Sequence, residues 1–235
     1  MKDSCTGSEV CPTGLRRRHL WRLAGIALII GAAALGIRLV SGPGCKSAEL
    51  LILVNPWNPI PSNYSPELVS LGDGHEIDAR CCEDLEDMLS ACRGEGYEPY
   101  ICSAYRTSEM QLSLYEDKVS RLMASGLDLS AARTEAARVV AIPGTSEHQL
   151  GLALDLISET YTNLDQWQER TEVQQWLMQN CWRYGFILRY PNGTSETTGI
   201  IYEPWHYRYV GSETAKAVAE SGLVFEDYLK TLESE

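Results

Sequence analysis

The chain has 235 residues, 44% of them hydrophobic and 22% charged, a composition typical of a globular protein rather than a disordered one. The net charge is −12; the first 40 residues hold six basic and two acidic side chains, which leaves 14 basic and 30 acidic ones from Ser41 onward, a net of −16. A domain this acidic repels phosphate backbones, so no nucleic-acid partner is expected.

A basic cluster followed by an apolar run predicts one membrane anchor near the N-terminus. Three arginines at 16–18 precede residues 23–40, which are apolar or Gly apart from Arg38. About 18 helical residues at roughly 1.5 Å each approach the hydrocarbon thickness. The basic flank predicts a cytoplasmic tail over residues 1–22, with everything after the anchor outside. A cleaved signal peptide and lipid attachment at Cys45 are the alternatives.

An external domain with several cysteines allows disulfides, but the spacing does not assign the pairs. No C-x-x-C is present among the six cysteines that follow the anchor, so a structural zinc cluster is not expected. Some of these thiols fit a helical core face instead. Their pairing stays open for Cys45, Cys81, Cys82, Cys92, Cys102 and Cys181.

The rest of the chain predicts a mixture of strands and helices. Residues 41–47 are a Gly/Pro/Ser linker, and the folded domain is expected over 48–235. The patterns predict strands at 50–54, 97–104, 150–157, 186–190 and 200–210. They predict helices at 78–93, 107–125, 130–141, 169–184 and 213–220, with a loop at 55–66 and a tail at the end. This irregular order favours an α+β fold with an antiparallel sheet.

Two of the four histidines lie in dense local patterns, and the first pattern surrounds His148. His148 opens a predicted strand in which Asp155 points away from the face that carries the leucines. An acid inside an apolar strand is costly unless it is paired or bound to a metal. Gly151 allows the turn that brings His148 back over the same face. His148 and Asp155 are therefore candidate metal ligands, with an ion pair between Asp155 and Arg106 as the alternative.

The second pattern is Glu203-Pro204-Trp205-His206. A regular strand would place Glu203 and His206 on opposite faces, but Pro204 interrupts the ladder and lets both turn inward. His206 would complete three ligands and leave a fourth position open for water, the layout of a catalytic zinc site. Zinc lowers the pKa of bound water to about 7, and Glu203 is placed to act as general base. A surface position for Glu203 is the alternative.

Together the two patterns resemble the VanY-type D-alanyl-D-alanine carboxypeptidases. The similarity rests on Ser146-x-His148-x6-Asp155 followed by Glu203-x-Trp205-His206, and it extends from about Leu50 to the C-terminus. It implies a small antiparallel sheet flanked by helices, the Hedgehog/D,D-peptidase-like zinc fold. It also implies that zinc binds to His148, Asp155 and His206, and that Glu203 is the catalytic base.

The resemblance also implies contacts with a substrate. Arg106 matches the family's substrate arginine, and a guanidinium can bind a free carboxylate or stabilise an oxyanion. Ser146 and Gln111 correspond to polar positions near the bound peptide, although residues 108–111 also fit a helix capping box that would occupy Gln111 locally. Trp205 either walls the pocket or belongs to the core.

The function implied is removal of the terminal D-alanine from peptidoglycan stem peptides, at the D-Ala-D-Ala bond. The enzyme would be a single-pass protein of the bacterial cell membrane with its catalytic domain outside. One alternative is an L,D-carboxypeptidase that acts on the tetrapeptide, because its zinc ligands and base would be identical. The other is a non-catalytic wall-binding domain of the same fold.

Overall fold

The structure is a computed structural model that describes residues 49–234, and the anchor expected over residues 23–40 lies outside this range. The central sheet has four antiparallel strands in the order β3 (Pro99–Ser103), β4 (Ala153–Ser158), β6 (Glu203–Tyr209) and β5 (Phe186–Tyr190). A small hairpin pairs β1 (Leu68–Ser70) with β2 (Glu76–Asp78). The predicted α+β class with a small antiparallel sheet is therefore confirmed.

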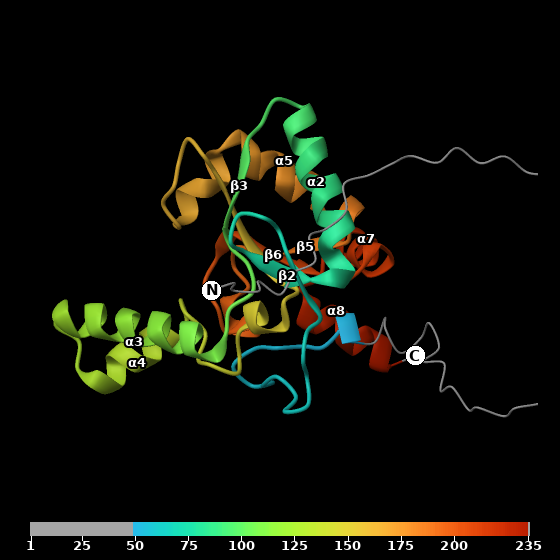
Figure 1. The fold of residues 1–235 in the computed structure, drawn as a ribbon. Coiled ribbons are helices and arrows are strands. Elements are labelled where there is room, and N and C mark those ends of the chain that lie inside the picture. The colour runs from blue at the N-terminus through green and yellow to red at the C-terminus, as the bar shows by residue number, and fades with distance from the viewer. Residues whose placement is uncertain (1–48, 235) are drawn as a thin grey trace, which may run out of the picture.

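Helices surround the sheet. The longer ones are α2 (Cys82–Gly94), α3 (Ser108–Ala124), α4 (Leu129–Ala137), α5 (Glu172–Asn180), α7 (Ser212–Ser221) and α8 (Phe225–Glu233), beside the one-turn α6 (Ser195–Thr198). Short 3-10 turns are η1 (Ala79–Cys81), η2 (Glu147–Leu150), η3 (Gln166–Arg170) and η4 (Cys181–Tyr184). Helices α3 and α4 form a hairpin that projects from the body (Figure 1). From Glu49 to Ser234, no helix combines the length and apolar character needed to span a membrane.

The main core lies on the leucine face of β4. Leu152, Leu154 and Leu156 are fully buried and pack in one cluster with the apolar side of α2, including Leu85 and Met88. Because successive strand residues point to opposite faces, Asp155 projects from the other side of β4. The predicted alternation thus directs the Asp155 carboxylate away from the hydrophobic core and toward the face of the sheet that carries polar side chains.

Several element predictions were wrong in detail. Residues 50–54 do not form a strand, because the carbonyls of Leu50 and Ile52 accept hydrogen bonds from Arg208 Nη2, at 2.9 and 3.0 Å, instead of pairing with another strand. The single helix expected over 169–184 is broken at Thr171, whose hydroxyl caps α5 by accepting from the Gln174 amide. Helix α8 occupies the segment that was expected to be a tail.

Three of the cysteines behave as core residues. Cys81, Cys92 and Cys181 are buried free thiols, and burial raises the pKa of each above its ordinary value. Cys102 is a partly exposed free thiol in β3, at the point where the register against β4 shifts between Ile101 and Ser103. The thiols that are buried stay protonated, so they pack as small apolar side chains.

Candidate active site

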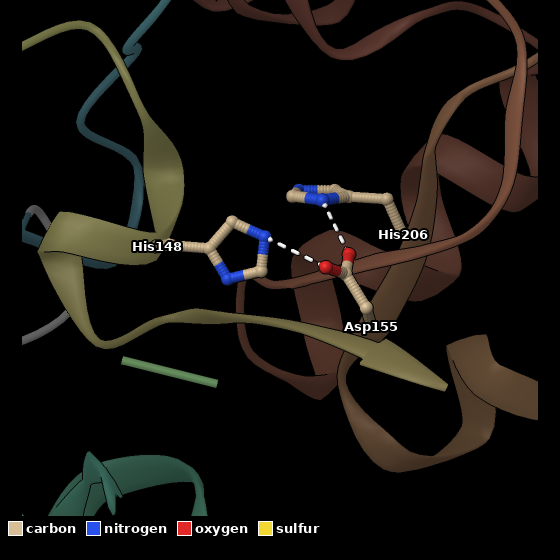
Figure 2. A group of neighbouring side chains, drawn as sticks. All are labelled: His148, Asp155 and His206. Carbon is tan, nitrogen blue, oxygen red and sulfur yellow. Dashed lines mark hydrogen bonds and ion pairs between the residues drawn. The ribbon is translucent and has the colours of Figure 1, made fainter. Parts of the chain in front are cut away.

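Three predicted ligands meet on the polar side of the sheet. Asp155 on β4 lies directly across the ladder from His206 on β6, and His148 reaches them from η2. The expectation that His148 opens a strand was wrong, but Gly151 does adopt the left-handed φ of +70° that ends η2 and turns the chain into β4. One ligand atom from each residue lies within 4.8 Å of the others, and all three residues are buried. Figure 2 shows the two imidazoles flanking the carboxylate.

Hydrogen bonds orient both rings. His148 Nδ1 lies 2.7 Å from the Ala104 carbonyl, which can only accept, so Nδ1 carries the proton and Nε2 presents its lone pair. That Nε2 lies 3.3 Å from Asp155 Oδ2, and His206 Nδ1 lies 3.1 Å from Asp155 Oδ1. The two nitrogens and the carboxylate form the N,O,N donor set of a catalytic zinc site, in which a fourth position stays open. The residues therefore fit zinc.

The ionisation states differ across the three ligands. Burial, helped by the charge of Arg106, lowers the pKa of His148 to about 4, so this imidazole is neutral at pH 7. Burial opposes the charge of His206 as well, but contacts with Asp155 and Glu147 outweigh it and raise that pKa to about 9. Burial also opposes ionisation of Asp155, yet both histidines and Arg106 lower its pKa well below the usual range. Asp155 is therefore an anionic ligand throughout the physiological range.

Glu203 lies at the start of β6, buried beside the ligands. Its Oε2 is 3.9 Å from His206 Nδ1. Leu188 pairs with Tyr207 but Tyr190 pairs with Glu203, so β6 carries extra residues around Pro204 and both Glu203 and His206 reach the same cavity. The predicted role of Pro204 in breaking the ladder agrees with this shift. Burial raises the pKa of Glu203 to about 8, so the carboxyl is mostly protonated at pH 7 in the metal-free site, and its carboxylate form is a stronger base than an exposed glutamate.

Arg106 approaches from the loop that follows β3. Its Nη2 lies 2.7 Å from Asp155 Oδ2, and its Nε donates to Ser103 Oγ at 2.7 Å. Nη1 has only a 3.4 Å contact with the side-chain oxygen of Gln111. The ion pair that the sequence offered as an alternative is thus present, and Arg106 also lines the cavity, with Nη1 held only by that long contact.

The predicted substrate residues line the same cavity as the ligands. Gln111 is buried and donates to the Ala141 carbonyl at 2.7 Å. The capping alternative for it was wrong, because Thr107 caps α3 by accepting from the Met110 amide. Ser146 and Trp205 are buried on the cavity wall, so both alternatives for Trp205 apply. The cavity lining also includes apolar side chains, from Leu114, Val139, Val140, Ala141, Leu164 and Ile200.

The sequence reasoning missed a layer of charged residues behind the ligands. Glu147 is fully buried, and its Oε1 accepts from Arg189 Nε and Arg208 Nη1, each at 2.8 Å. Arg189 also pairs with Glu226 of α8, at 2.6 and 2.9 Å. Tyr190 packs on the His206 ring at a centroid distance of 4.8 Å. The available signal was the placement of Arg189 and Arg208 inside apolar strands, where a charge needs a partner.

Comparison with known proteins identifies the family. The VanY D-alanyl-D-alanine carboxypeptidase family model matches residues 74–212. The chain belongs to the VanY family. A D-alanyl-D-alanine carboxypeptidase of Enterococcus faecalis is 45% identical over 181 residues, a match that covers 77% of this chain and 66% of that protein. The chain therefore spans about two thirds of that relative's length.

Solved structures of VanY relatives share the fold. The vancomycin-resistance D,D-pentapeptidase VanY from a VanB-type cassette, in complex with Zn(II), is 44% identical with a TM-score of 0.71, covering 77% of this chain and 99% of that one. VanYB in complex with D-alanine-D-alanine is 45% identical with a TM-score of 0.71, covering 77% and 97%. The LdcB LD-carboxypeptidase is 34% identical with a TM-score of 0.67, covering 77% and 86%.

Proposed function

We propose that this protein is a zinc-dependent carboxypeptidase that removes the terminal D-alanine from peptidoglycan stem peptides. One observation carries the proposal: a buried N,O,N donor set, a carboxyl with a raised pKa and a guanidinium converge on one cavity. A purely structural cluster would not need a buried acid such as Glu203, whose contact with His206, at 3.9 Å, is long. The complete set favours turnover over a wall-binding domain that keeps only the fold.

Each side chain has a distinct task in hydrolysis. Zinc bound by His148, Asp155 and His206 would polarise the scissile carbonyl and bring the pKa of water to about 7. Glu203 takes the proton from the attacking water, which its raised pKa permits, and returns it to the amine of the departing D-alanine. The proton balance closes because the same carboxyl accepts once and donates once.

Substrate recognition needs a partner for the free C-terminal carboxylate. Arg106 supplies this partner through its Nη1 edge, which lies in the cavity and is not committed to Asp155. The side-chain oxygen of Gln111 lies 3.4 Å from Arg106 Nη1. The amide nitrogen of Gln111 donates to the Ala141 carbonyl, which fixes the orientation of the amide. A guanidinium placed for the C-terminal carboxylate of a peptide supports exopeptidase rather than endopeptidase specificity.

A D-Ala-D-Ala bond is the favoured target. The relative named as a D,D-pentapeptidase is 44% identical to this chain, and VanYB, solved with D-alanine-D-alanine, is 45% identical. The LD-carboxypeptidase is 34% identical. The L,D alternative keeps the same ligands and base, so the choice between the two bonds depends on the cavity wall.

A substrate panel tests the proposal. The zinc-loaded full chain is given a pentapeptide ending in D-Ala-D-Ala, a tetrapeptide ending in an L-D bond, and the free dipeptide, and released D-alanine is measured. We expect release mainly from the pentapeptide, none with Glu203→Gln, and normal release with Glu196→Gln, an exposed acid outside the cavity. Cleavage of none of the three by the zinc-loaded protein would refute the proposal.

We also propose that residues 23–40 anchor the enzyme in the bacterial cell membrane, with the catalytic domain outside. Support comes from the arginines at 16–18 and the apolar run that follows them. Peptidoglycan as the substrate requires the same location. Mass spectrometry of the membrane-bound protein should find an intact N-terminus, whereas a new start near Cys45 would replace the anchor with a cleaved or lipidated leader.

A further inference from the structure

Glu147 lies in the sequence between the cavity residue Ser146 and the metal ligand His148. Its side chain is fully buried, and its two oxygens have different surroundings. Oε1 accepts from two guanidinium groups, Arg189 Nε and Arg208 Nη1, each at 2.8 Å. Oε2 has no hydrogen-bond partner. The carboxylate is therefore fixed at one oxygen and open at the other.

The open oxygen faces a metal ligand. Glu147 Oε2 lies 3.6 Å from His206 Nε2, which also has no hydrogen-bond partner. Over residues 49–234, these two atoms belong to a set of only three buried side-chain N or O atoms without a partner, the third being His75 Nδ1. Buried polar atoms without partners are rare, so two that face each other call for an explanation.

The other histidine ligand supplies the comparison. His148 donates from Nδ1 to the Ala104 carbonyl at 2.7 Å, which leaves Nε2 toward Asp155. His206 is reversed: its Nδ1 is toward Asp155 at 3.1 Å, so its Nε2 needs an acceptor on the outer side. Glu147 Oε2 is the acceptor placed there. Histidine ligands generally donate their second N–H to such an acceptor, which fixes the ring and makes it a better donor to the metal.

We propose that Glu147 is a positioning residue for the metal centre: its carboxylate accepts the Nε2–H of His206 and so reserves Nδ1 for the zinc ion. The inference rests on the proposed zinc site and adds to it a residue outside the ligand set. Arg189 and Arg208 hold Oε1, which aims Oε2 at the imidazole. Glu226 fixes Arg189 in turn through two contacts, at 2.6 and 2.9 Å, so α8 supports the same aim.

Glu147→Gln tests the role because it keeps the shape and removes the charge. The two arginines need an acceptor, so the amide oxygen turns to them and the amide NH2 meets His206 Nε2–H, donor against donor. We expect zinc affinity, measured on the full chain by competition with a chelator, to fall about 10–100-fold. Asp84→Asn is the matched control, because Asp84 accepts from Tyr209 on the same strand β6 but lies outside the cavity. Its zinc affinity should equal that of the wild type.

A folded Glu147→Gln protein with wild-type zinc affinity would overturn the proposal. If the variant does not fold, nitrogen NMR of the zinc-loaded wild type with labelled histidine decides the question. The proposal requires that His206 carry its proton on Nε2 and bind the metal through Nδ1; the opposite tautomer would overturn it. Peptide cleavage is not part of either readout. Zinc binding without hydrolysis would therefore refute the proposed function and leave the role of Glu147 intact.

Discussion

Arg106 and Asp155 form an ion pair between a partly buried guanidinium and a buried carboxylate, in which Nη2 lies 2.7 Å from Oδ2, the oxygen that His148 Nε2 also approaches at 3.3 Å. The proposed substrate arginine is thus in direct contact with a metal ligand. A positive charge so close to the ligands opposes binding of a cation, while the proposed function gives the same guanidinium the task of binding the substrate carboxylate. Removal of Arg106 should therefore affect metal and substrate in opposite directions.

We expect Arg106→Gln to lower kcat/KM for the pentapeptide about 10²–10³-fold, the usual cost of losing one preorganised transition-state donor. Zinc should bind at least as tightly as in the wild type, because a neighbouring cation has been removed. Steady-state kinetics and chelator competition measure the two effects. Arg93→Gln, which removes only an exposed contact to Glu98 at 3.8 Å, is the control and should change neither. Loss of zinc together with activity would show that Arg106 is needed to build the ligand set.

Glu203 and His206 should separate chemistry from metal binding. Glu203→Gln should retain stoichiometric zinc and lose nearly all turnover, because the carboxyl that transfers the proton is gone. His206→Ala should lose the metal itself, because it removes one of three ligands. Metal content by atomic absorption, beside the rate of D-alanine release, distinguishes the two variants. Equal zinc content in both proteins would contradict the assignment of His206 as a ligand.

Zinc binding should release a proton at pH 7. His206 has its pKa raised to about 9, so the metal-free protein holds a proton there that zinc must displace, whereas His148, with a pKa of about 4, has none to lose. Below pH 7, apparent affinity should then rise about tenfold per pH unit as the His206 proton becomes easier to displace. Calorimetry of Glu203→Gln at pH 6, in buffers of different ionisation enthalpy, isolates the proton of His206. This variant lacks the ionisable carboxyl of Glu203, and water bound to zinc, with a pKa of about 7, keeps most of its protons at that pH. If the purified Glu203→Gln variant binds zinc in this experiment without releasing a proton, the raised pKa of His206 is contradicted.

Glu226 should matter for stability although it lies outside the cavity. Glu226→Gln breaks a buried pair with Arg189 and leaves a guanidinium with fewer partners, a change that typically costs about 3–5 kcal/mol. Asp227→Asn, the next residue of α8, removes only a partly exposed pair with Lys230 and should stay within about 0.5 kcal/mol of the wild type. Denaturant unfolding of the metal-free proteins measures both. Equal unfolding free energies would show that the pair contributes nothing to the fold.

The ligands could be predicted from the sequence because their signals are local. Asp155 interrupts an alternating strand, Gly151 permits the turn before it, and Pro204 breaks the second strand where His206 must turn inward. The strand 186–190 has the bounds that were expected, since Gly185 ends the preceding turn and Pro191 follows. Neighbouring residues carry the information for each segment by itself, whereas the meeting of His206 with Asp155, 51 residues away, was predicted from the resemblance to the VanY family.

The buried charged residues next to the ligands, Glu147, Arg189, Arg208 and Glu226, could not be predicted as a group because they are distant from one another in sequence. Glu147 lies 42 residues from Arg189 and 61 from Arg208, and a charged side chain gives no local sign of which one it will meet. The apolar run at 50–54 is typical of a strand, but Arg208 satisfies two of its carbonyls. Helix α8 was missed for the same reason, because Phe225 packs with Ile187 and Val218, and Glu226 pairs with Arg189, all of them in other elements.

The apolar wall of the cavity is built separately from the ligands. Leu114 comes from α3, Val139 and Val140 follow α4, and Leu164 belongs to the loop before η3, whereas β4, β6 and η2 supply the metal donors. Substitutions in these segments would therefore change the shape of the cavity without altering the metal donors. A protein engineer can diversify the helical hairpin and the loop before η3 while leaving the strands untouched.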